Sequence, residues 1–158
     1  MILKFIIKIF GRIIGLYARI RDYLYKQYYR ANGIEIGKST YLSPKAYIDL
    51  HKPGKINIGE NCYITRNVVI LCHTDTHKGG PLGIWEKDGE GREFGSVTIG
   101  DNVFIGVNSV VMPGVSIGNN VIIGALTLVN MDIPNGKIVA GVPAKIVGLT
   151  ENHIKDFL

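Results

Sequence analysis

Between residues 34 and 134 of this 158-residue chain, hydrophobic side chains recur at every sixth position. Stepping by six within each uninterrupted segment meets only Leu, Ile or Val, at Ile36, Leu42, Ile48, Ile58, Ile64, Ile70, Ile99, Ile105, Val111, Ile117, Ile123 and Val129. A small or β-branched residue lies two positions before most of them, as at Thr40, Ala46, Cys62 and Val68. Both positions are expected to point inward, as in a solenoid whose repeats stack around one core.

Turn residues fix the length of each coil. The dipeptide Ile-Gly occurs at 36–37, 58–59, 99–100 and 117–118, and the four copies follow an 18-residue period once two insertions are removed. The first insertion adds four residues around 51–54, and the second adds 23 residues over 73–95. Three hexads therefore make one coil, and Gly, Asn and Asp suit corners with positive φ. The pattern predicts an all-β triangular solenoid of about four coils.

Residues 1–32 follow a different period. Charged side chains recur every three or four residues, with one gap of seven, at Lys4, Lys8, Arg12, Arg19, Asp22, Lys26 and Arg30. Apolar and tyrosine side chains fill the intervening positions, which predicts an amphipathic helix with a wide apolar face. A membrane span needs about 20 mostly apolar residues, and the regular charges argue against one. The same charges, and the lack of a small-residue cleavage site after them, argue against a signal peptide.

Charge and cysteine content narrow the choice of partners. The net charge is +5, but residues 1–32 hold seven basic side chains and one acid, and the remainder holds 11 basic and 12 acidic residues, or −1. The charge therefore belongs to the helix and indicates no nucleic-acid surface. The helix either lies in an anionic membrane interface or packs on the protein body or a sister subunit. Cys62 and Cys72 are expected to be free thiols in a cytoplasmic protein. If the helix lies in a membrane interface, the protein is expected to be peripheral on the inner face of the cytoplasmic membrane.

Three features together resemble the hexapeptide-repeat acyltransferases: the Ile-Gly-x-Asn-Val hexads, an excursion that begins at His73, and the tail Ile-Val-Ala-Gly-Val-Pro-Ala-Lys at 138–145. The resemblance covers residues 34–148 and is strongest to the galactoside, maltose, nodulation-factor and polysaccharide O-acetyltransferases. It implies a left-handed parallel β-helix over 33–148 and a homotrimer with active sites between subunits. Acetyl-CoA would lie in that cleft, and no metal is expected. Residues 149–158 are expected to form a short C-terminal helix.

The resemblance also assigns roles in the long excursion, which is polar and of a length usually seen in functional loops. His73 matches the general base that takes a proton from the acceptor hydroxyl, and His77 is a rival four positions later. Asp75, or a backbone carbonyl, would orient the imidazole. Ser43 and Trp85 are the candidate contacts to the acceptor.

The cofactor contacts are carried over from the same resemblance, at Phe104, Gly106, Val107, Ala125, Gly141 and Lys145. The amides of Gly106 and Val107 would polarise the thioester carbonyl, Ala125 would contact the pantetheine arm, and Lys145 would lie near the nucleotide phosphates. The sequence Asn-Met-Asp at 130–132 departs from the Thr-Lys-Asp of many relatives and removes one basic contact.

The expected function is acetyl-CoA-dependent O-acetylation of a sugar hydroxyl in a surface polysaccharide, a lipid-linked precursor or a related saccharide. An N-acetyltransferase of nucleotide-linked amino sugars is an alternative. A metal-dependent hydratase resembling the γ-class carbonic anhydrases would need three protein ligands, for which His51 would have to join His73 and His77. His51 is otherwise expected to face solvent or a neighbouring coil. A membrane-associated solenoid scaffold is the non-enzymatic alternative.

Overall fold

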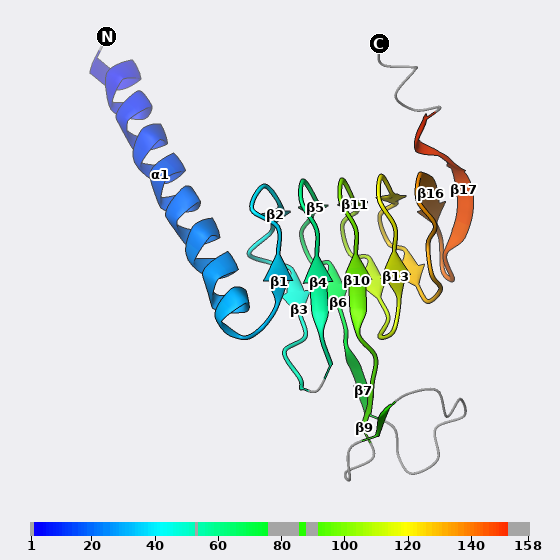
Figure 1. Ribbon diagram of the computed structural model, residues 1–158. Coiled ribbons are helices and arrows are strands. Elements are labelled where there is room, and N and C mark those ends of the chain that lie inside the picture. Colours follow the sequence, from blue (N-terminus) through cyan, green and yellow to red (C-terminus); the bar gives the residue numbers. More distant parts are fainter. Residues whose placement is uncertain (1, 53, 76–85, 88–91, 152–158) are drawn as a thin grey trace.

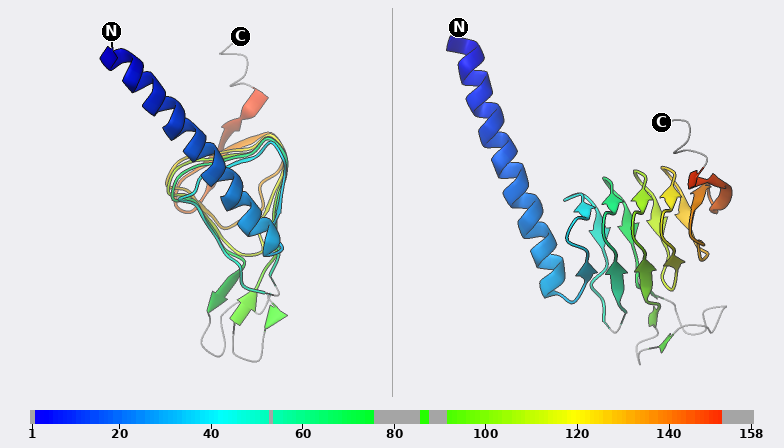
Figure 2. Two further views of the ribbon diagram at one scale, coloured as in Figure 1. Left: turned by 90° about the vertical axis from the view of Figure 1, so that its left-hand side faces the viewer. Right: turned by 45° about the horizontal axis from the view of Figure 1, so that its top comes forward.

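A computed structural model describes residues 2–52, 54–75, 86–87 and 92–151. The helix α1 (Ile2–Ala31) leads into a stack of three-sided coils, whose cross-section is triangular when viewed along the stack (Figures 1 and 2). Each side of the triangle is a sheet of short parallel strands, one strand from each coil, and one of the three sheets ends in an additional antiparallel strand. We name the three sides faces A, B and C.

The strands of each face lie in adjacent coils. Face A contains β1 (Glu35–Ile36), β4 (Ile56–Ile58), β10 (Val97–Ile99) and β13 (Ser116–Ile117). Face B contains β2 (Tyr41–Leu42), β5 (Tyr63–Ile64), β11 (Phe104–Ile105), β14 (Ile122–Ile123), β16 (Lys137–Ala140) and β17 (Lys145–Leu149). Face C contains β3 (Tyr47–Ile48), β6 (Val69–Ile70), β12 (Val110–Val111) and β15 (Leu128–Val129).

The register of the strands places each hexad residue on its counterpart in the next coil. On face A, for example, Ile36 pairs with Ile58, Ile58 with Ile99, and Ile99 with Ile117. All twelve hexad residues are buried, as are the small or β-branched residues two positions earlier. The prediction of an inward-facing pair in each hexad is therefore confirmed. The parallel strands and the repeat fit a left-handed β-helix.

The corners depend on residues that tolerate positive φ. Five asparagines have φ between 54° and 60°, namely Asn61, Asn67, Asn102, Asn108 and Asn120. Their side chains form ladders between coils, since Asn67 donates to Asn108 at 3.0 Å and Asn102 donates to Asn120 at 3.1 Å. Leu126, with φ 57°, occupies the place of Asn67 and Asn108 in the next coil.

The long excursion is more ordered at its base than the expected loop. Its ends form an antiparallel sheet of β7 (His73–Asp75), β9 (Arg92–Phe94) and β8 (Glu86–Lys87), in the order β7-β9-β8. The reason is geometric: the chain leaves and re-enters the stack at one corner, where the Gly95 amide donates to Cys72 O at 2.9 Å, so the two ends run side by side. Residues 76–85 and 88–91, with His77 and Trp85, lie outside the described residues.

The end of the stack is covered by the chain itself. After β16 the chain reverses, and β17 pairs antiparallel with β16 along the edge of face B. Leu149, expected in the C-terminal helix, belongs to β17, and helix begins at Thr150. The rest of that expected helix, from residue 152 onward, lies outside the described residues.

The other end of the stack is closed by α1, which crosses the first coil and extends beyond it (Figures 1 and 2). Lys26 Nζ donates to Thr40 O at 3.0 Å, and Arg30 Nη2 donates to Ile36 O at 2.6 Å. The hydroxyl of Tyr25 donates to Ala46 O at 3.2 Å. The last two turns of α1 therefore donate hydrogen bonds to main-chain carbonyls of the first coil, which has no neighbouring coil of the described chain on that side to bond them. Two members of the predicted basic stripe bind the protein itself rather than an outside partner.

Candidate active site

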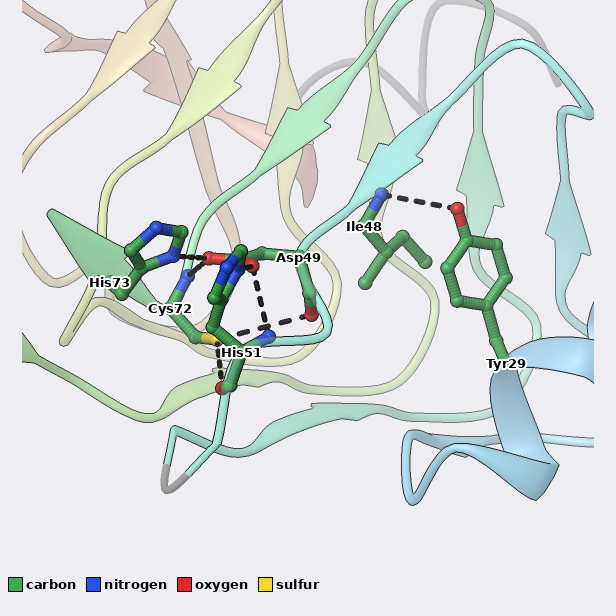
Figure 3. A network of polar contacts seen from close by, with 6 residues as sticks. All are labelled: Tyr29, Ile48, Asp49, His51, Cys72 and His73. Carbon is green, nitrogen blue, oxygen red and sulfur yellow. Dashed lines mark hydrogen bonds and ion pairs between the residues drawn. The ribbon is translucent and has the colours of Figure 1, made fainter. Parts of the chain in front are cut away.

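A fully buried carboxylate, Asp49, lies at the centre of the candidate site (Figure 3). It follows β3 at the corner between faces C and A. Its Oδ1 accepts hydrogen bonds from the His51 amide at 3.1 Å and from His51 Nδ1 at 2.7 Å. Its Oδ2 accepts from the Cys72 amide at 3.1 Å and from His73 Nδ1. Each oxygen thus receives one backbone donor and one imidazole.

The stacking of the coils brings the two histidines together. Tyr47 pairs with Val69 and Ile48 with Ile70, so the same register carried three residues further places His51 beside His73. Both insertions therefore begin at one corner of successive coils. The two imidazole rings lie 3.9 Å apart between centroids with an interplanar angle of 39°. The side chain of His51 is 48% exposed and that of His73 is 14% exposed.

The donors decide the charge of Asp49. Burial alone raises the pKa of this carboxyl, but the hydrogen bonds from His51, His73 and the Cys72 amide outweigh burial and lower the pKa well below its usual range. An ionised carboxylate only accepts, so Nδ1 of each histidine carries a hydrogen, and in the neutral form of either ring Nε2 is the acceptor.

Cys72, beside the histidines, is not a nucleophile. Burial and the neighbouring Asp49 charge raise the pKa of the Cys72 thiol to about 12, so it stays protonated at neutral pH. Its Sγ lies 3.3 Å from His51 O, and both cysteines are free thiols. The thiol therefore serves packing at this corner.

The arrangement suits general-base catalysis. A carboxylate on Nδ1 holds the ring in one tautomer and stabilises the imidazolium that forms when Nε2 takes a proton. His73 has this arrangement at the entrance to the excursion, where the family resemblance implies the base.

A carboxylate that the sequence analysis did not name, Asp49, bonds His73. The side chain of Asp75 lies outside the described part of the chain, so its predicted orienting role stays a prediction. His51, expected to face solvent or a neighbouring coil, is half-exposed and shares Asp49 with His73. Asp49 and His51 could have been found from the sequence by continuing the alignment of successive coils past Ile48. That alignment places the start of the first insertion beside the start of the second.

Asp49, His51 and His73 also have the spacing of a metal-ligand set, with one candidate ligand atom from each lying within 4.8 Å of the others. Nδ1 of both histidines, however, faces a carboxylate oxygen as a hydrogen-bond donor. The described residues therefore form a hydrogen-bonded cluster around the Asp49 carboxylate, and a cation bound through Nδ1 would have to displace those hydrogens.

Comparison with known proteins identifies the family. The profile described as bacterial transferase hexapeptide (six repeats) matches residues 96–130. The Staphylococcus aureus protein CapG is 39% identical over 125 residues, which is 78% of this chain and 70% of CapG. The chain belongs to the hexapeptide-repeat transferase family. The resemblance drawn from the motifs is thereby confirmed.

Other members of the family are named acetyltransferases. YvoF of Bacillus subtilis is 34% identical over 128 residues, which is 81% of this chain and 66% of YvoF. A galactoside acetyltransferase solved with coenzyme A has a TM-score of 0.58 at 27% identity, and the match covers 77% of this chain and 67% of that one. The polysialic acid O-acetyltransferase OatWY also has a TM-score of 0.58, at 32% identity over 71% of this chain and 51% of its own.

The residues that the family resemblance assigns to the cofactor gather mainly along a different corner. Gly106, Val107 and Ala125 lie where face B turns into face C, in the third and fourth coils. Leu128 N donates to Gly141 O at 3.0 Å, which places Gly141 beside β15 of face C. We call Gly106, Val107, Ala125 and Gly141 the corner row. Phe104 lies just before the row on face B, and Lys145 is exposed at the start of β17.

Two details of the corner row bear on the predicted roles. A Cβ at Gly106 would lie 2.5 Å from Ala125 N, so only glycine allows these coils to stack. The Gly106 amide donates to Ile123 O at 2.8 Å and is not free to polarise a thioester. Of the two predicted amides, that of Val107, a residue 39% exposed, is left for that role.

Ser43, which was predicted to contact the acceptor, lies at the corner between faces B and C, where the corner row also lies, and not at the corner of the histidines. It is buried at the B-to-C corner of the first coil, and its Oγ accepts a hydrogen bond from the Lys45 amide at 3.2 Å. The hydroxyl therefore stabilises the turn. The structure does not bring Ser43 and His73 together in one chain.

Proposed function

We propose that the protein is an acetyl-CoA-dependent O-acetyltransferase that acylates a sugar hydroxyl of a surface polysaccharide, a lipid-linked glycan precursor or a related saccharide. The observation that carries this proposal is the His73 imidazole, held through Nδ1 by the buried, ionised Asp49 at the entrance to the excursion. The relatives named for coenzyme A and for polysialic acid support the donor and the class of acceptor.

In the proposed reaction, His73 Nε2 accepts the proton of the acceptor hydroxyl as its oxygen attacks the thioester carbonyl. A tetrahedral intermediate forms and collapses, the carbon–sulfur bond breaks, and the departing coenzyme A sulfur takes the proton back from the imidazolium. Asp49 stays ionised throughout and stabilises the transient positive charge. No metal takes part in any step.

We also propose that the enzyme is a homotrimer with its active sites between chains. The histidines and the corner row lie at opposite ends of face C in one chain, so a single chain does not present base and donor to each other. A neighbouring chain that contributes its own corner row would complete the site, in agreement with the trimer that the family resemblance implies.

Measuring thiol release from acetyl-CoA with a panel of glycans and nucleotide-linked amino sugars tests the proposed chemistry. His73→Ala is expected to lower turnover by about 10²- to 10⁴-fold, the usual contribution of a general base, with thermal unfolding as the control for folding. Activity is expected with a glycan hydroxyl and to survive EDTA. Equal turnover by the variant would refute the base, acylation of amino sugars alone would favour the N-acetyltransferase, and loss in EDTA would favour a metal site.

We further propose peripheral association with an anionic membrane, of the kind found on the inner face of the cytoplasmic membrane. Among the described side chains of α1, seven apolar or tyrosine side chains beyond the first coil are at least half exposed, namely Ile13, Ile14, Leu16, Tyr17, Ile20, Tyr23 and Leu24. Most lie on the side opposite Lys26 and Arg30, which bind the first coil. The anchoring of α1 therefore turns this apolar side, which we call the outer face of α1, away from the β-helix.

Cations border the outer face on both edges. Helical spacing puts Arg12 and Arg19 in one row with Leu16 and Tyr23, and it puts Arg21 in the opposite row between Tyr17 and Leu24. An apolar strip with arginines at its margins is typical of helices that lie in the headgroup region of anionic lipids.

In the portion of the chain covered by the structure, no helix combines the length and the apolar character that crossing a bilayer requires.

A further inference from the structure

A groove opens where α1 meets the first coil. Its volume is about 300 Å³, and it is lined by Tyr28, Tyr29, Tyr47, Ile48, Leu50 and His51. We call it the tyrosine groove. One wall belongs to the last turns of α1 and the other to β3 and the residues that follow it. The groove therefore depends on the contacts that fix α1 on the coil, among them the hydrogen bonds of Tyr25, Lys26 and Arg30.

One end of the groove lies at the cluster of Asp49, His51 and His73. His51 lines the groove and also donates from Nδ1 to Asp49, the carboxylate that holds His73. The two imidazole rings lie 3.9 Å apart between centroids and are tilted by 39° to each other. A molecule seated in the groove thus contacts a ring that lies directly against the proposed base.

The lining has the chemistry of a sugar site. Tyr28 and Tyr47 are 54% and 51% exposed and offer aromatic surface with hydroxyl tips. Leu50 adds apolar surface, and His51 adds an imidazole to the lining. A pyranose ring has an apolar C–H face and a hydroxyl edge, which match an aromatic wall and a few placed polar groups. The volume is at the lower end for ligand pockets and suits one sugar ring.

The alternative occupant is part of coenzyme A. The described lining contains no Lys or Arg to meet its phosphates. The residues assigned to the cofactor by resemblance lie mostly along the corner row, at the far end of face C. The groove therefore complements a neutral ring better than a polyanionic nucleotide.

We propose that the tyrosine groove is the acceptor subsite, where a pyranose ring packs on Tyr28 and Tyr47 while His51 Nε2 accepts a hydrogen bond from one of its hydroxyls. A hydroxyl on an adjacent carbon then reaches Nε2 of His73, whose ring lies next to that of His51. This inference rests on the proposed O-acetyltransferase and names the residues that select its acceptor.

Steady-state kinetics with the saccharide that is acetylated fastest in the panel test the proposed subsite. Tyr47→Ala and Tyr28→Ala are each expected to raise the KM for the saccharide about tenfold, equivalent to about 1.4 kcal/mol, and to leave the KM for acetyl-CoA unchanged. Tyr47→Phe keeps the ring and is expected to behave like the wild type. Tyr63→Ala is the matched control, since Tyr63 is 49% exposed on β5 of face B, away from the groove. Changes in the saccharide KM no larger than those of the control would overturn the proposal.

A deoxy acceptor isolates the role of His51. Against an acceptor that lacks the hydroxyl next to the acetylated one, His51→Ala is expected to lose less in kcat/KM than against the parent saccharide. An equal loss with both acceptors would remove His51 from the acceptor contacts.

A binding measurement that needs no turnover distinguishes failure of the subsite proposal from failure of the proposed function. Saturation-transfer NMR with a panel of methyl pyranosides is expected to show contact with the wild type, His73→Ala and Tyr63→Ala, but weaker contact with Tyr47→Ala. Transfer that is unaffected by Tyr47→Ala, or absent from the wild type, would overturn the groove assignment. Turnover that survives His73→Ala would instead overturn the proposed base and leave the binding result standing.

Discussion

At the scale of single residues, the buried Asp49 carboxylate organises the candidate site. It accepts four hydrogen bonds, from two amides and two imidazoles, and so satisfies its lone pairs without solvent. Its charge fixes the tautomer of His73, and its hydrogen bonds connect the two insertions. Catalysis and local stability are therefore expected to depend on the same side chain.

Replacing Asp49 with Asn tests this dependence. We expect Asp49→Asn to lower kcat by about 10²-fold or more, because an amide cannot stabilise the imidazolium. The free energy of unfolding at pH 7 should fall by about 3 kcal/mol, the usual result of removing one partner from a buried charged cluster. Stopped-flow or steady-state assays and denaturant titrations measure the two effects.

The stability effect has a defined pH dependence. The folded-state pKa of Asp49 is lowered relative to the unfolded value of about 3.9. The stabilisation is therefore fully present above the unfolded pKa and is lost as the pH falls towards the folded pKa. The gap in unfolding free energy between wild type and Asp49→Asn should narrow as the pH is lowered below about 4. A gap that stayed constant down to pH 2 would contradict the assigned ionisation.

At the scale of elements, the corners determine how well successive coils stack. Asn67 and Asn108 share a ladder at the corner between faces B and C, and both tolerate the left-handed backbone. The next position in that ladder is Leu126, whose φ is 57° and whose side chain is 64% exposed. A leucine in this conformation costs about 1 kcal/mol or more and contributes no ladder hydrogen bond.

Leu126→Asn is therefore expected to stabilise the protein by about 1 kcal/mol and to raise Tm by about 2–4 °C. Asn108→Leu is the matched control: it places the same side chain at the equivalent position one coil earlier and is expected to lower Tm. Differential scanning calorimetry compares the two. A lower Tm for Leu126→Asn would mean that the leucine packs against something that the isolated chain lacks, such as a neighbouring subunit.

At the scale of the whole molecule, two surfaces of one chain are incomplete by themselves. The outer face of α1 exposes apolar side chains that the β-helix does not cover. The base and the corner row lie at opposite ends of face C. A membrane would cover the first surface, and a second copy of the chain would complete the second.

Flotation with liposomes tests the membrane surface. The wild type is expected to float with anionic liposomes at low salt and to dissociate at high salt, because exposed cations contribute through screened attraction. Ile13→Ser/Ile20→Ser/Leu24→Ser should abolish flotation. The matched control is Ile146→Ser/Val147→Ser, which removes exposed apolar side chains from β17 at the other end of the stack. Equal flotation by the α1 variant and its control would reject the membrane role.

Mixing inactive variants tests the shared active site. The chain has a mass of 17.4 kDa, so a trimer has three times that mass, about 52 kDa, by light scattering. His73→Ala and Ala125→Phe, which crowds the corner row, should each be inactive alone. Refolded together, they should regain part of the activity, because some sites then combine an intact His73 with an intact corner row. A mixture as inactive as its parents would place the whole site in one chain.

The sequence by itself determined the repeat and its core. A six-residue period has one inward phase, so Ile36 and the eleven equivalent residues could be assigned to the interior without knowing any contact between coils. The three- to four-residue spacing of charges likewise indicated the helix at the N-terminus. Ladder-forming asparagines follow from the same repeat, because each corner needs residues that accept positive φ.

The tertiary structure decided which residues meet. Asp49 and His51 lie 24 and 22 positions before His73, and only the register between β3 and β6 shows that they share its corner. Local spacing suggested Asp75 but could not reveal Asp49, because spacing along the chain carries no information on contacts between coils. The basic stripe is divided for the same kind of reason. Lys26 and Arg30 donate to carbonyls of the first coil, whereas the N-terminal part of α1 extends beyond that coil (Figure 1). Periodicity identifies the face on which a residue lies, and only packing between elements determines what that face contacts.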